Sequence, residues 1–202
     1  MTIKLLVATR NPGKIKEYRD ILMDLPVRIT WLDAEGIELE VEETGSTFEE
    51  NALLKAMTYA RLSGLLTWAD DSGLEVDALG GWPGVASARH AGPYATDGER
   101  TQILLQRLEG VRYERRTAVF RCVVALATPD GQSWTASGSS SGVITYAPQG
   151  QGGFGYDPVF YVPKYQRTYA QLDPVEKNDL SHRGRAAVKA KVLLKRYLEK
   201  VA

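Results

Sequence analysis

The N-terminal third of the chain alternates between strand-like and helix-like patterns, and this alternation restricts the possible folds more than any other feature. Short apolar runs at residues 3–8, 27–32 and 65–69 are typical of buried strands, and amphipathic helical patterns separate them. Farther along, residues 117–127 and 133–144 form two long β-rich runs joined by a Pro-Asp-Gly turn, which is typical of a hairpin. Together these patterns predict an α/β protein with a long mixed β-sheet and flanking helices.

Capping signals mark where helices begin. Residues 46–49 read Ser-Thr-Phe-Glu, a capping box that opens a helix running to Gly64. A second capping box at residues 96–99 opens a helix that ends near Leu108, and residues 181–201 form a basic amphipathic helix. The sequence contains no repeat, linker or low-complexity tail, so we expect the loops that carry chemistry to belong to one folded unit.

Length and charge limit the classes of function. A chain of 202 residues, 44% of them hydrophobic, suits one domain or two small lobes that share a core, and we predict that residues 1–202 form a single domain. Lys and Arg number 25, as do Asp and Glu, so no overall positive field would hold nucleic acid or an anionic membrane. No apolar run is long enough for a signal segment or a membrane span, which predicts a soluble cytoplasmic protein. The single Cys122 excludes an internal disulfide and fits a small buried hydrophobe better than a nucleophile.

Two adjacent carboxylates, Asp70 and Asp71, end the third apolar run. Successive side chains of an extended chain point to opposite sides, so the two acids cannot serve one ligand equally unless the chain turns between them. Ser72 and Gly73 are typical of a turn. We expect one acid to act at a functional site and the other to hold structure. Mg²⁺ suits such a site because it takes one or two carboxylates with water and phosphate oxygens. The competing interpretation is that each Asp only initiates the turn.

A phosphate cradle is the functional interpretation of residues 9–14, which follow a predicted strand and open a helix. Asn11 is the predicted N-cap, and the unpaired N–H groups and positive dipole of a helix N-terminus favour an anion. Lys14 adds a point charge, although the spacing is not that of a P-loop. Ordinary helix capping with a solvated lysine explains the same residues.

Acidic residues gather around the start of the second helix. Glu49 and Glu50 fall in its first turn, where they stabilise the helix dipole. Glu42 and Glu43 precede the cap, where that explanation is weaker. Lys55 lies on the same helix and could pair with a surface acid or contact a phosphate.

Residues 150–155 match the dinucleotide-binding pattern G-x-G-x-x-G, but their context does not. A β-like run follows in place of a helix, so we reject a dinucleotide site. The loop instead displays Phe154 and Tyr156, which could stack on a base or simply pack in the core.

Cationic groups precede and open the last predicted helix. Lys177 comes shortly before it, and residues 181–184 read Ser-His-Arg-Gly. The rigid donor fork of Arg183 suits carbonyl or phosphate oxygens, and a helix start favours electron-rich groups. A solvated helix start is the simpler interpretation, and it ranks above His182 as a general base.

Five blocks of the chain occur in the order found in one enzyme family: TRNPGK, EETGSTFEENALLKA, ADDSGL, GGFGYDPVF and SHRG. Over residues 9–184 the sequence resembles the noncanonical purine nucleoside triphosphate pyrophosphatases, also called the inosine triphosphatase or XTP/dITP diphosphatase family. The resemblance implies Mg²⁺-dependent hydrolysis of dITP, ITP and XTP to the monophosphate and pyrophosphate by a homodimer that removes deaminated purines from the nucleotide pool. It also implies a two-lobed fold with the active site in the cleft between the lobes.

The resemblance further implies a role for each residue at a matched motif position. Asp71 would be the proton acceptor and, together with Glu42, would hold the metal. The phosphates and the adjoining part of the substrate would be bound by Thr9, Asn11, Lys14, Lys55 and Ser72. The base would be bound by Phe154, Gly155, Tyr156, Asp157, Lys177, His182 and Arg183.

The chemistry of these residues agrees with such roles. Hydrolysis between the α- and β-phosphates needs an oriented water, a carboxylate to activate it and cations that neutralise the leaving pyrophosphate. Donors such as His182 and Arg183 would favour a 6-oxo purine over adenine. Two other functions stay open: a nucleotide-binding or sensing protein that has lost hydrolysis, and a pyrophosphatase for other nucleotides such as modified pyrimidine triphosphates.

Overall fold

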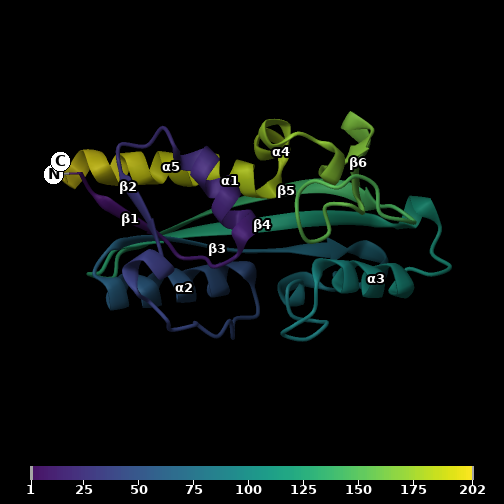
Figure 1. Ribbon diagram of the computed structural model, residues 1–202, viewed down its shortest axis with the longest axis horizontal. Coiled ribbons are helices and arrows are strands. Elements are labelled where there is room, and N and C mark those ends of the chain that lie inside the picture. Colours follow the sequence, from purple (N-terminus) through teal and green to yellow (C-terminus); the bar gives the residue numbers. More distant parts are fainter. Residues whose placement is uncertain (1, 202) are drawn as a thin grey trace. The chain divides into compact units, whose positions relative to one another are not determined.

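The computed structural model describes residues 2–201, and within them one mixed β-sheet of seven strands is flanked by five α-helices (Figure 1). The strands are β1 (Lys4–Val7), β2 (Arg28–Trp31), β3 (Leu66–Val76), β4 (Thr117–Ala127), β5 (Ser133–Ile144), β6 (Phe160–Val162) and β7 (Arg167–Thr168). The helices are α1 (Pro12–Leu22), α2 (Phe48–Ser63), α3 (Asp97–Arg107), α4 (Pro174–Leu180) and α5 (His182–Val201). The strand order β2-β1-β3-β4-β5-β6-β7 combines parallel and antiparallel pairs, which confirms the predicted α/β class.

The chain divides into two compact units. Among the described residues, unit 1 comprises 2–71, 122–138 and 183–201, and unit 2 comprises 72–121 and 139–182. Strands β3, β4 and β5 contribute residues to both units. Each unit has its own buried apolar clusters, so the division follows the packing of side chains. The assignment of the full chain to a single domain stays a prediction.

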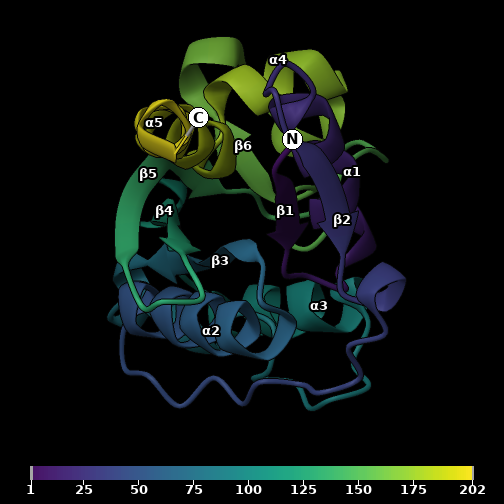
Figure 2. The same ribbon diagram turned by 90° about the vertical axis from the view of Figure 1, so that its left-hand side faces the viewer.

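In unit 1, helices cover both faces of the sheet. β1 pairs in parallel with β2 and with β3. Leu5 and Val7 pack in one buried cluster with residues of α1 and α5, whereas Leu6 packs in another with residues of α2. Figures 1 and 2 show α1 and α5 on one face and α2 on the other. Because side chains alternate along a strand, a strand between two helical layers requires consecutive apolar residues, which β1 provides from Leu5 to Val7.

The helix starts agree closely with the sequence. Asn11 caps α1 and Thr96 caps α3, as predicted. The predicted start of α2 is wrong by one residue, because Thr47 is the N-cap and forms the capping box with Glu50. This arrangement places the Glu50 carboxylate where it accepts hydrogen bonds from Ser46 N–H, from the Ser46 hydroxyl and from Thr47 N–H. Together with Glu50 N–H, which donates to Thr47 Oγ1, these contacts pair several donors at the start of α2.

β3 differs most from its prediction. The predicted strand ended at Ala69 and turned at Ser72 and Gly73, but β3 continues to Val76. It lies between β1 and β4 in the sheet, and Leu74 and Val76 are fully buried in the cluster of unit 2. Sheet hydrogen bonds and burial therefore override a local pattern that is typical of a turn.

Unit 2 contains the antiparallel strands and an aromatic cluster. β5 pairs with β6, and β6 pairs with β7. The ring of Phe120 lies 4.6 Å from that of Phe160 and 5.9 Å from that of Tyr169, measured between centroids. A Cβ atom at Gly142 of β5 would lie 2.6 Å from the carbonyl oxygen of Tyr161, so glycine permits the close approach of β6.

Unit 2 also contains two elements that the sequence analysis missed, the short strand β7 and the helix α4. The start of α4 carries readable signals, because Asp173 and Glu176 form a capping box and Pro174 stands at the first helical position. Among residues 2–201, no helix combines the length and the apolar composition that crossing a membrane requires.

Candidate functional site

The two acids of β3 face opposite helical layers of unit 1, as strand geometry predicts. Both are buried, with Asp70 2% and Asp71 5% exposed. A carboxylate oxygen of Asp70 lies 2.8 Å from Lys14 Nζ of α1 and 3.7 Å from Arg183 Nε of α5. A carboxylate oxygen of Asp71 lies 3.7 Å from Lys55 Nζ of α2. Each acid therefore meets a different cationic group.

Asp70 belongs to a buried chain of alternating charges. Glu17 binds Arg183 at 2.5 Å, Arg183 faces Asp70, and Asp70 binds Lys14. Burial alone would raise the pKa of Asp70, but the charges of Lys14 and Arg183 outweigh it and hold that pKa well below its usual range. Two anions and two cations balance, which allows these groups to stay charged away from water.

Lys14 stands at the N-terminus of α1, where the predicted phosphate-binding residues gather. Asn11 N–H donates to Thr9 Oγ1 at 3.2 Å, and Lys14 N–H donates to Asn11 Oδ1 at 3.0 Å. Burial lowers the pKa of Lys14, and Asp70 opposes that effect while the nearby charge of Lys55 adds to it. Two lysines therefore lie close enough to act on each other, which is favourable for binding a polyanion.

Asn51 of α2 ties Asp71 to the loop that precedes that helix. Its Oδ1 accepts a hydrogen bond from Gly45 N–H at 2.7 Å, which leaves its Nδ2 to donate to Asp71 Oδ2 at 3.1 Å. A Cβ atom at Gly45 would lie 2.7 Å from Asn51 Oδ1, so this contact requires glycine. Burial raises the pKa of Asp71, and the charge of Lys55 only partly offsets this. Asp71 is thus an oriented carboxylate with a raised proton affinity.

Lys55 bridges two acids. Its Nζ binds the Glu43 carboxylate and lies 3.7 Å from Asp71, whereas Glu42, the predicted metal ligand, is exposed. Across residues 2–201, no three side chains of Asp, Glu, His or Cys gather as a metal site would need. Mg²⁺ takes only one or two carboxylates from a protein and completes its ligands with water and phosphate. The carboxylates of Asp71 and of Glu42, which precedes α2, could supply these one or two protein ligands.

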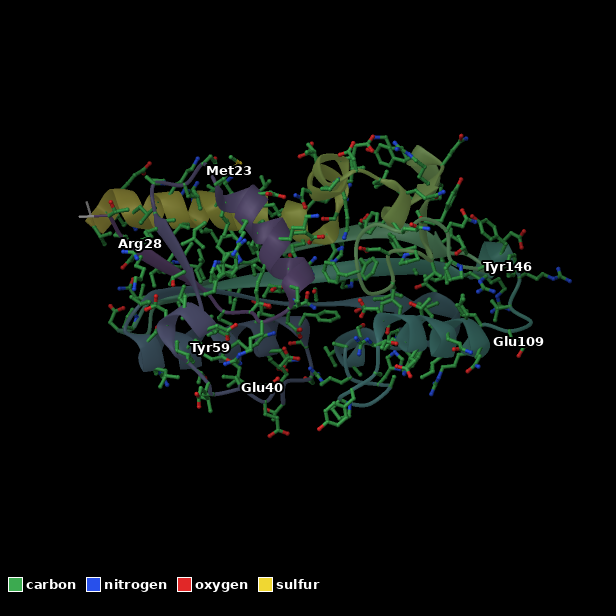
Figure 3. The ribbon with its side chains drawn as sticks, in the orientation of Figure 1. Met23, Arg28, Glu40, Tyr59, Glu109 and Tyr146 are labelled. Carbon is green, nitrogen blue, oxygen red and sulfur yellow. The ribbon has the colours of Figure 1, made fainter. Side chains whose placement is uncertain are left out.

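The segment of residues 39–43, which precedes α2 and carries Glu40, Glu42 and Glu43, is held by a tyrosine of α2. The Tyr59 hydroxyl donates to the carbonyl oxygen of Leu39 at 3.1 Å and accepts from Val41 N–H at 3.3 Å. Figure 3 labels Tyr59 on α2 and Glu40 on the segment that it holds. Because both contacts are to the backbone, they fix the path of the chain just before the paired glutamates.

The second group of predicted residues lies in unit 2 and centres on Asp157. Its carboxylate accepts a hydrogen bond from Phe154 N–H at 2.8 Å and binds Lys177 Nζ at 2.5 Å. Lys177 Nζ also lies 4.7 Å from the centre of the Phe154 ring. A Cβ atom at Gly153 would lie 2.1 Å from an oxygen of Asp157, so the turn closes only with glycine at that position. The G-x-G-x-x-G segment therefore builds a turn around a carboxylate, and β6 rather than a helix follows it.

Two predicted base-binding residues have buried rings. Tyr156 packs in the apolar cluster of unit 2, which is the core-packing alternative considered for it. Its hydroxyl donates to the carbonyl oxygen of Ser87 at 2.8 Å and lies 2.6 Å from His90 Nε2. The ring of His182 stacks on Phe120 with 4.5 Å between centroids.

Both units contain predicted site residues. In unit 1 these are Thr9, Asn11, Lys14, Lys55, Asp71 and Arg183. In unit 2 they are Phe154, Gly155, Tyr156, Asp157, Lys177 and His182. Ser72 follows Asp71 on β3 and is half-buried, and Glu42 points into solvent beside Glu43.

Three residues that contact the predicted site residues were not predicted from the sequence: Glu17, Asn51 and Glu43. Glu17 is three residues from Lys14, so both lie near one face of α1, and this spacing was the signal available in the sequence. Asn51 and Glu43 lie in the matched block EETGSTFEENALLKA, but no local pattern indicates that Asn51 contacts Asp71 or that Glu43 contacts Lys55.

Comparisons with known proteins show what the chain as a whole is similar to. The sequence model of the Ham1 family matches residues 5–192. The chain is 50% identical over 194 residues to a dITP/XTP pyrophosphatase of Desulforamulus reducens, covering 96% of each chain. It is 52% identical over 183 residues to a dITP/XTP pyrophosphatase of Geobacter sulfurreducens, covering 91% of this chain and 92% of the relative. A solved structure of a HAM1 protein from Coxiella burnetii matches with a TM-score of 0.87 and 43% identity, over 96% of this chain and 100% of that one.

Proposed function

The chain belongs to the Ham1 family, and from this premise we propose that it hydrolyses dITP, ITP and XTP to the nucleoside monophosphate and pyrophosphate. Such an enzyme would remove deaminated purines from the nucleotide pool. The observation that carries the proposal is the acid pair of β3, where Asp71 lies beside Lys55 and Asp70 holds Lys14. An oriented carboxylate with two nearby cations is what hydrolysis of a triphosphate needs.

In this proposal the cationic residues of unit 1 hold the triphosphate. Lys14 and Lys55 supply positive charge, and Thr9, Asn11 and the first turn of α1 supply hydrogen-bond donors. Because Asp70 binds Lys14 at 2.8 Å, the ammonium group has little freedom left to lose when a phosphate binds. Cations in this position also neutralise the charge that develops on the leaving pyrophosphate.

Mg²⁺ is the proposed metal, and Asp71 and Glu42 are the proposed protein ligands. Glu43 is engaged with Lys55, whereas the exposed Glu42 carboxylate faces solvent. Substrate phosphate oxygens and water would complete the oxygen ligands that Mg²⁺ prefers. When bound, the ion supplies positive charge to the phosphate oxygens.

Asp71 is the proposed proton acceptor. Water adds to phosphorus, the bond between the α- and β-phosphates breaks, pyrophosphate leaves, and the Asp71 carboxylate takes the proton that the water loses. The hydrogen bond from Asn51 orients this carboxylate. Because burial raises the pKa of Asp71, its carboxylate is a stronger base than that of an exposed aspartate.

The residues of unit 2 are the proposed contacts of the base. Phe154 offers a ring face for stacking, and Lys177 and His182 offer donors to the 6-oxo group of hypoxanthine or xanthine. Adenine carries an amino group at that position, which cannot accept hydrogen bonds from those donors. Asp157 supports this arrangement by binding Lys177. Arg183 is assigned to the base on the resemblance alone.

We also propose that the protein acts in the cytoplasm as a homodimer, without a nucleic-acid or membrane partner. The support is the family resemblance and the balance of 25 basic against 25 acidic residues, which gives no overall positive field. Sedimentation velocity at micromolar concentration should give the mass of a dimer, and a monomer at all concentrations would contradict this part of the proposal.

A panel of nucleoside triphosphates, assayed with Mg²⁺ for released pyrophosphate, tests the function. We expect dITP, ITP and XTP to react far faster than dATP or dGTP, and Asp71→Asn to abolish the reaction while keeping the side-chain shape. Asp77→Asn is a matched control, because Asp77 is an exposed acid that accepts a hydrogen bond from Thr117 at 2.6 Å. Equal turnover of all purine triphosphates would contradict the specificity, and full activity in Asp71→Asn would contradict the mechanism. Binding of dITP without release of pyrophosphate would indicate a nucleotide-binding protein instead.

A further inference from the structure

A residue of α3 fastens the loop of residues 154–157, termed here the FGYD loop, at its centre. Gly155 N–H donates to Asp97 Oδ2 at 2.7 Å. The other carboxylate oxygen of Asp97 accepts a hydrogen bond from Arg100, one turn farther along α3, at 2.8 Å. Both oxygens of one carboxylate are therefore used, one within the helix and one on the loop.

A second contact holds the side chain of the next loop residue. The Tyr156 hydroxyl donates to the carbonyl oxygen of Ser87, so it can only accept from His90, whose Nε2 must carry the proton. Burial lowers the pKa of His90, which agrees with a neutral imidazole. The loop is thus held by its backbone at one residue and by its side chain at the next.

The residues on either side of these contacts are the ones proposed to meet the base, Phe154 and Asp157. Between them, Gly155 has a φ of +61° and no atom within 4 Å of its Cβ position. Side-chain packing therefore does not fix the backbone at Gly155. Two hydrogen bonds hold it: the short one from its amide to Asp97 at 2.7 Å, and a longer one that its carbonyl oxygen accepts from the Thr101 hydroxyl at 3.4 Å. A charge-assisted bond of this kind is stronger than one between neutral groups.

We propose that Asp97 is a positioning residue for base recognition, which holds the Gly155 amide so that Phe154 and Asp157 are presented to a purine in one conformation. This inference rests on the proposed function. The Asp97 side chain is 46% exposed, so removing it disturbs the fold less than removing a buried partner would, although Arg100, whose side chain is 18% exposed, loses its carboxylate. A carboxylate that served only the stability of α3 would leave substrate preference unchanged.

Three variants test the positioning role. Asp97→Ala removes the acceptor, Asp97→Asn keeps an uncharged acceptor, and Asp77→Ala removes an exposed acid elsewhere in unit 2 as the matched control. For Asp97→Ala we expect the KM for dITP to rise about tenfold, as the loss of one charge-assisted hydrogen bond implies, with kcat within about twofold of wild type. The preference for dITP over dGTP should fall. Asp97→Asn should lie between wild type and Asp97→Ala, and Asp77→Ala should match wild type.

Hydrogen exchange gives a readout that does not depend on activity. In Asp97→Ala, peptides that cover residues 152–158 should exchange faster, while peptides of β4 should exchange at the wild-type rate and so report an intact fold. Wild-type KM, preference and exchange in Asp97→Ala would overturn the inference, as would a loss confined to kcat or the same effects in Asp77→Ala. Failure of the wild-type protein to hydrolyse dITP would instead refute the proposed function.

Discussion

Replacing Asp70 with Asn tests the charge balance that holds Lys14. The variant keeps the shape of the side chain but leaves two cations, Lys14 and Arg183, facing the single anion Glu17. Removing one partner of a buried ion pair costs about 3–5 kcal/mol. The Lys14 side chain is 15% exposed and can turn toward water or lose its proton, so we expect the lower end, about 3 kcal/mol of unfolding free energy. In a chain of this size that lowers Tm by about 6–12 °C.

Urea denaturation, followed by tryptophan fluorescence, measures this loss as a lower midpoint with an unchanged slope. The sign of the pH dependence is a second observable. Burial lowers the pKa of Lys14, and Asp70→Asn removes the carboxylate that opposes this effect. As the pH rises toward the ordinary lysine pKa, the folded chain therefore loses that proton before the unfolded chain does. The stability of the variant should therefore rise between pH 7 and pH 9.5 more steeply than that of wild type.

A double-mutant cycle separates the ion pair from its surroundings. Lys14→Met combined with Asp70→Asn removes both charges, so the double variant should recover much of the stability that Asp70→Asn loses. Each single variant leaves one charge without its partner and should be less stable than wild type. Asp77→Asn is the control and should stay within about 0.5 kcal/mol of wild type. A loss below about 1 kcal/mol in Asp70→Asn, with no dependence on pH and no coupling to Lys14, would refute the reasoning.

Three further predictions concern Cys122, Gly153 and His90. Cys122 is fully buried, and burial raises its thiol pKa to about 12, so iodoacetamide at pH 8 should label it only after unfolding in urea; prompt labelling of the native protein would contradict this. Gly153→Ala should lose about 2 kcal/mol more than Gly155→Ala in urea denaturation, because its Cβ atom would lie 2.1 Å from Asp157 whereas the Cβ position at Gly155 is open; equal losses would count against it. Burial lowers the pKa of His90, so its imidazole binds a proton more readily in the unfolded chain than in the folded one. Wild type should therefore lose more stability between pH 7 and pH 5 than His90→Phe, and parallel pH profiles would rule this out.

The sequence alone predicted the elements whose signals are local. The bounds of β4 and β5 agree with the predicted runs, and the caps of α1 and α3 were identified correctly. Side-chain periodicity, capping and hairpin turns involve residues within a few positions of one another, so they can be recognised without knowledge of the tertiary structure. The family was indicated separately, by the resemblance of five ordered sequence blocks to those of the pyrophosphatases.

Tertiary packing decided the length of β3. An acid pair followed by Ser72 and Gly73 resembles a turn, yet β1 and β4 flank the strand and it continues to Val76. The pairing partners of a strand come from distant parts of the chain, and their hydrogen bonds outweigh a local turn preference. The prediction failed where the competing interaction was not local.

The acid pair itself shows both contributions. The two-residue period of a strand, read from the sequence, placed Asp70 and Asp71 on opposite sides. Only the tertiary structure identified their partners, because Lys14 and Lys55 come from different helices and the Glu17–Arg183 pair that completes the charge balance joins residues 166 positions apart. The pKa of a carboxylate depends on how deeply it is buried and which charges surround it, and long-range packing determines both. The sequence could therefore predict that the two acids differ, whereas the fold decided that Asp70 stays strongly ionised and that the pKa of Asp71 is raised.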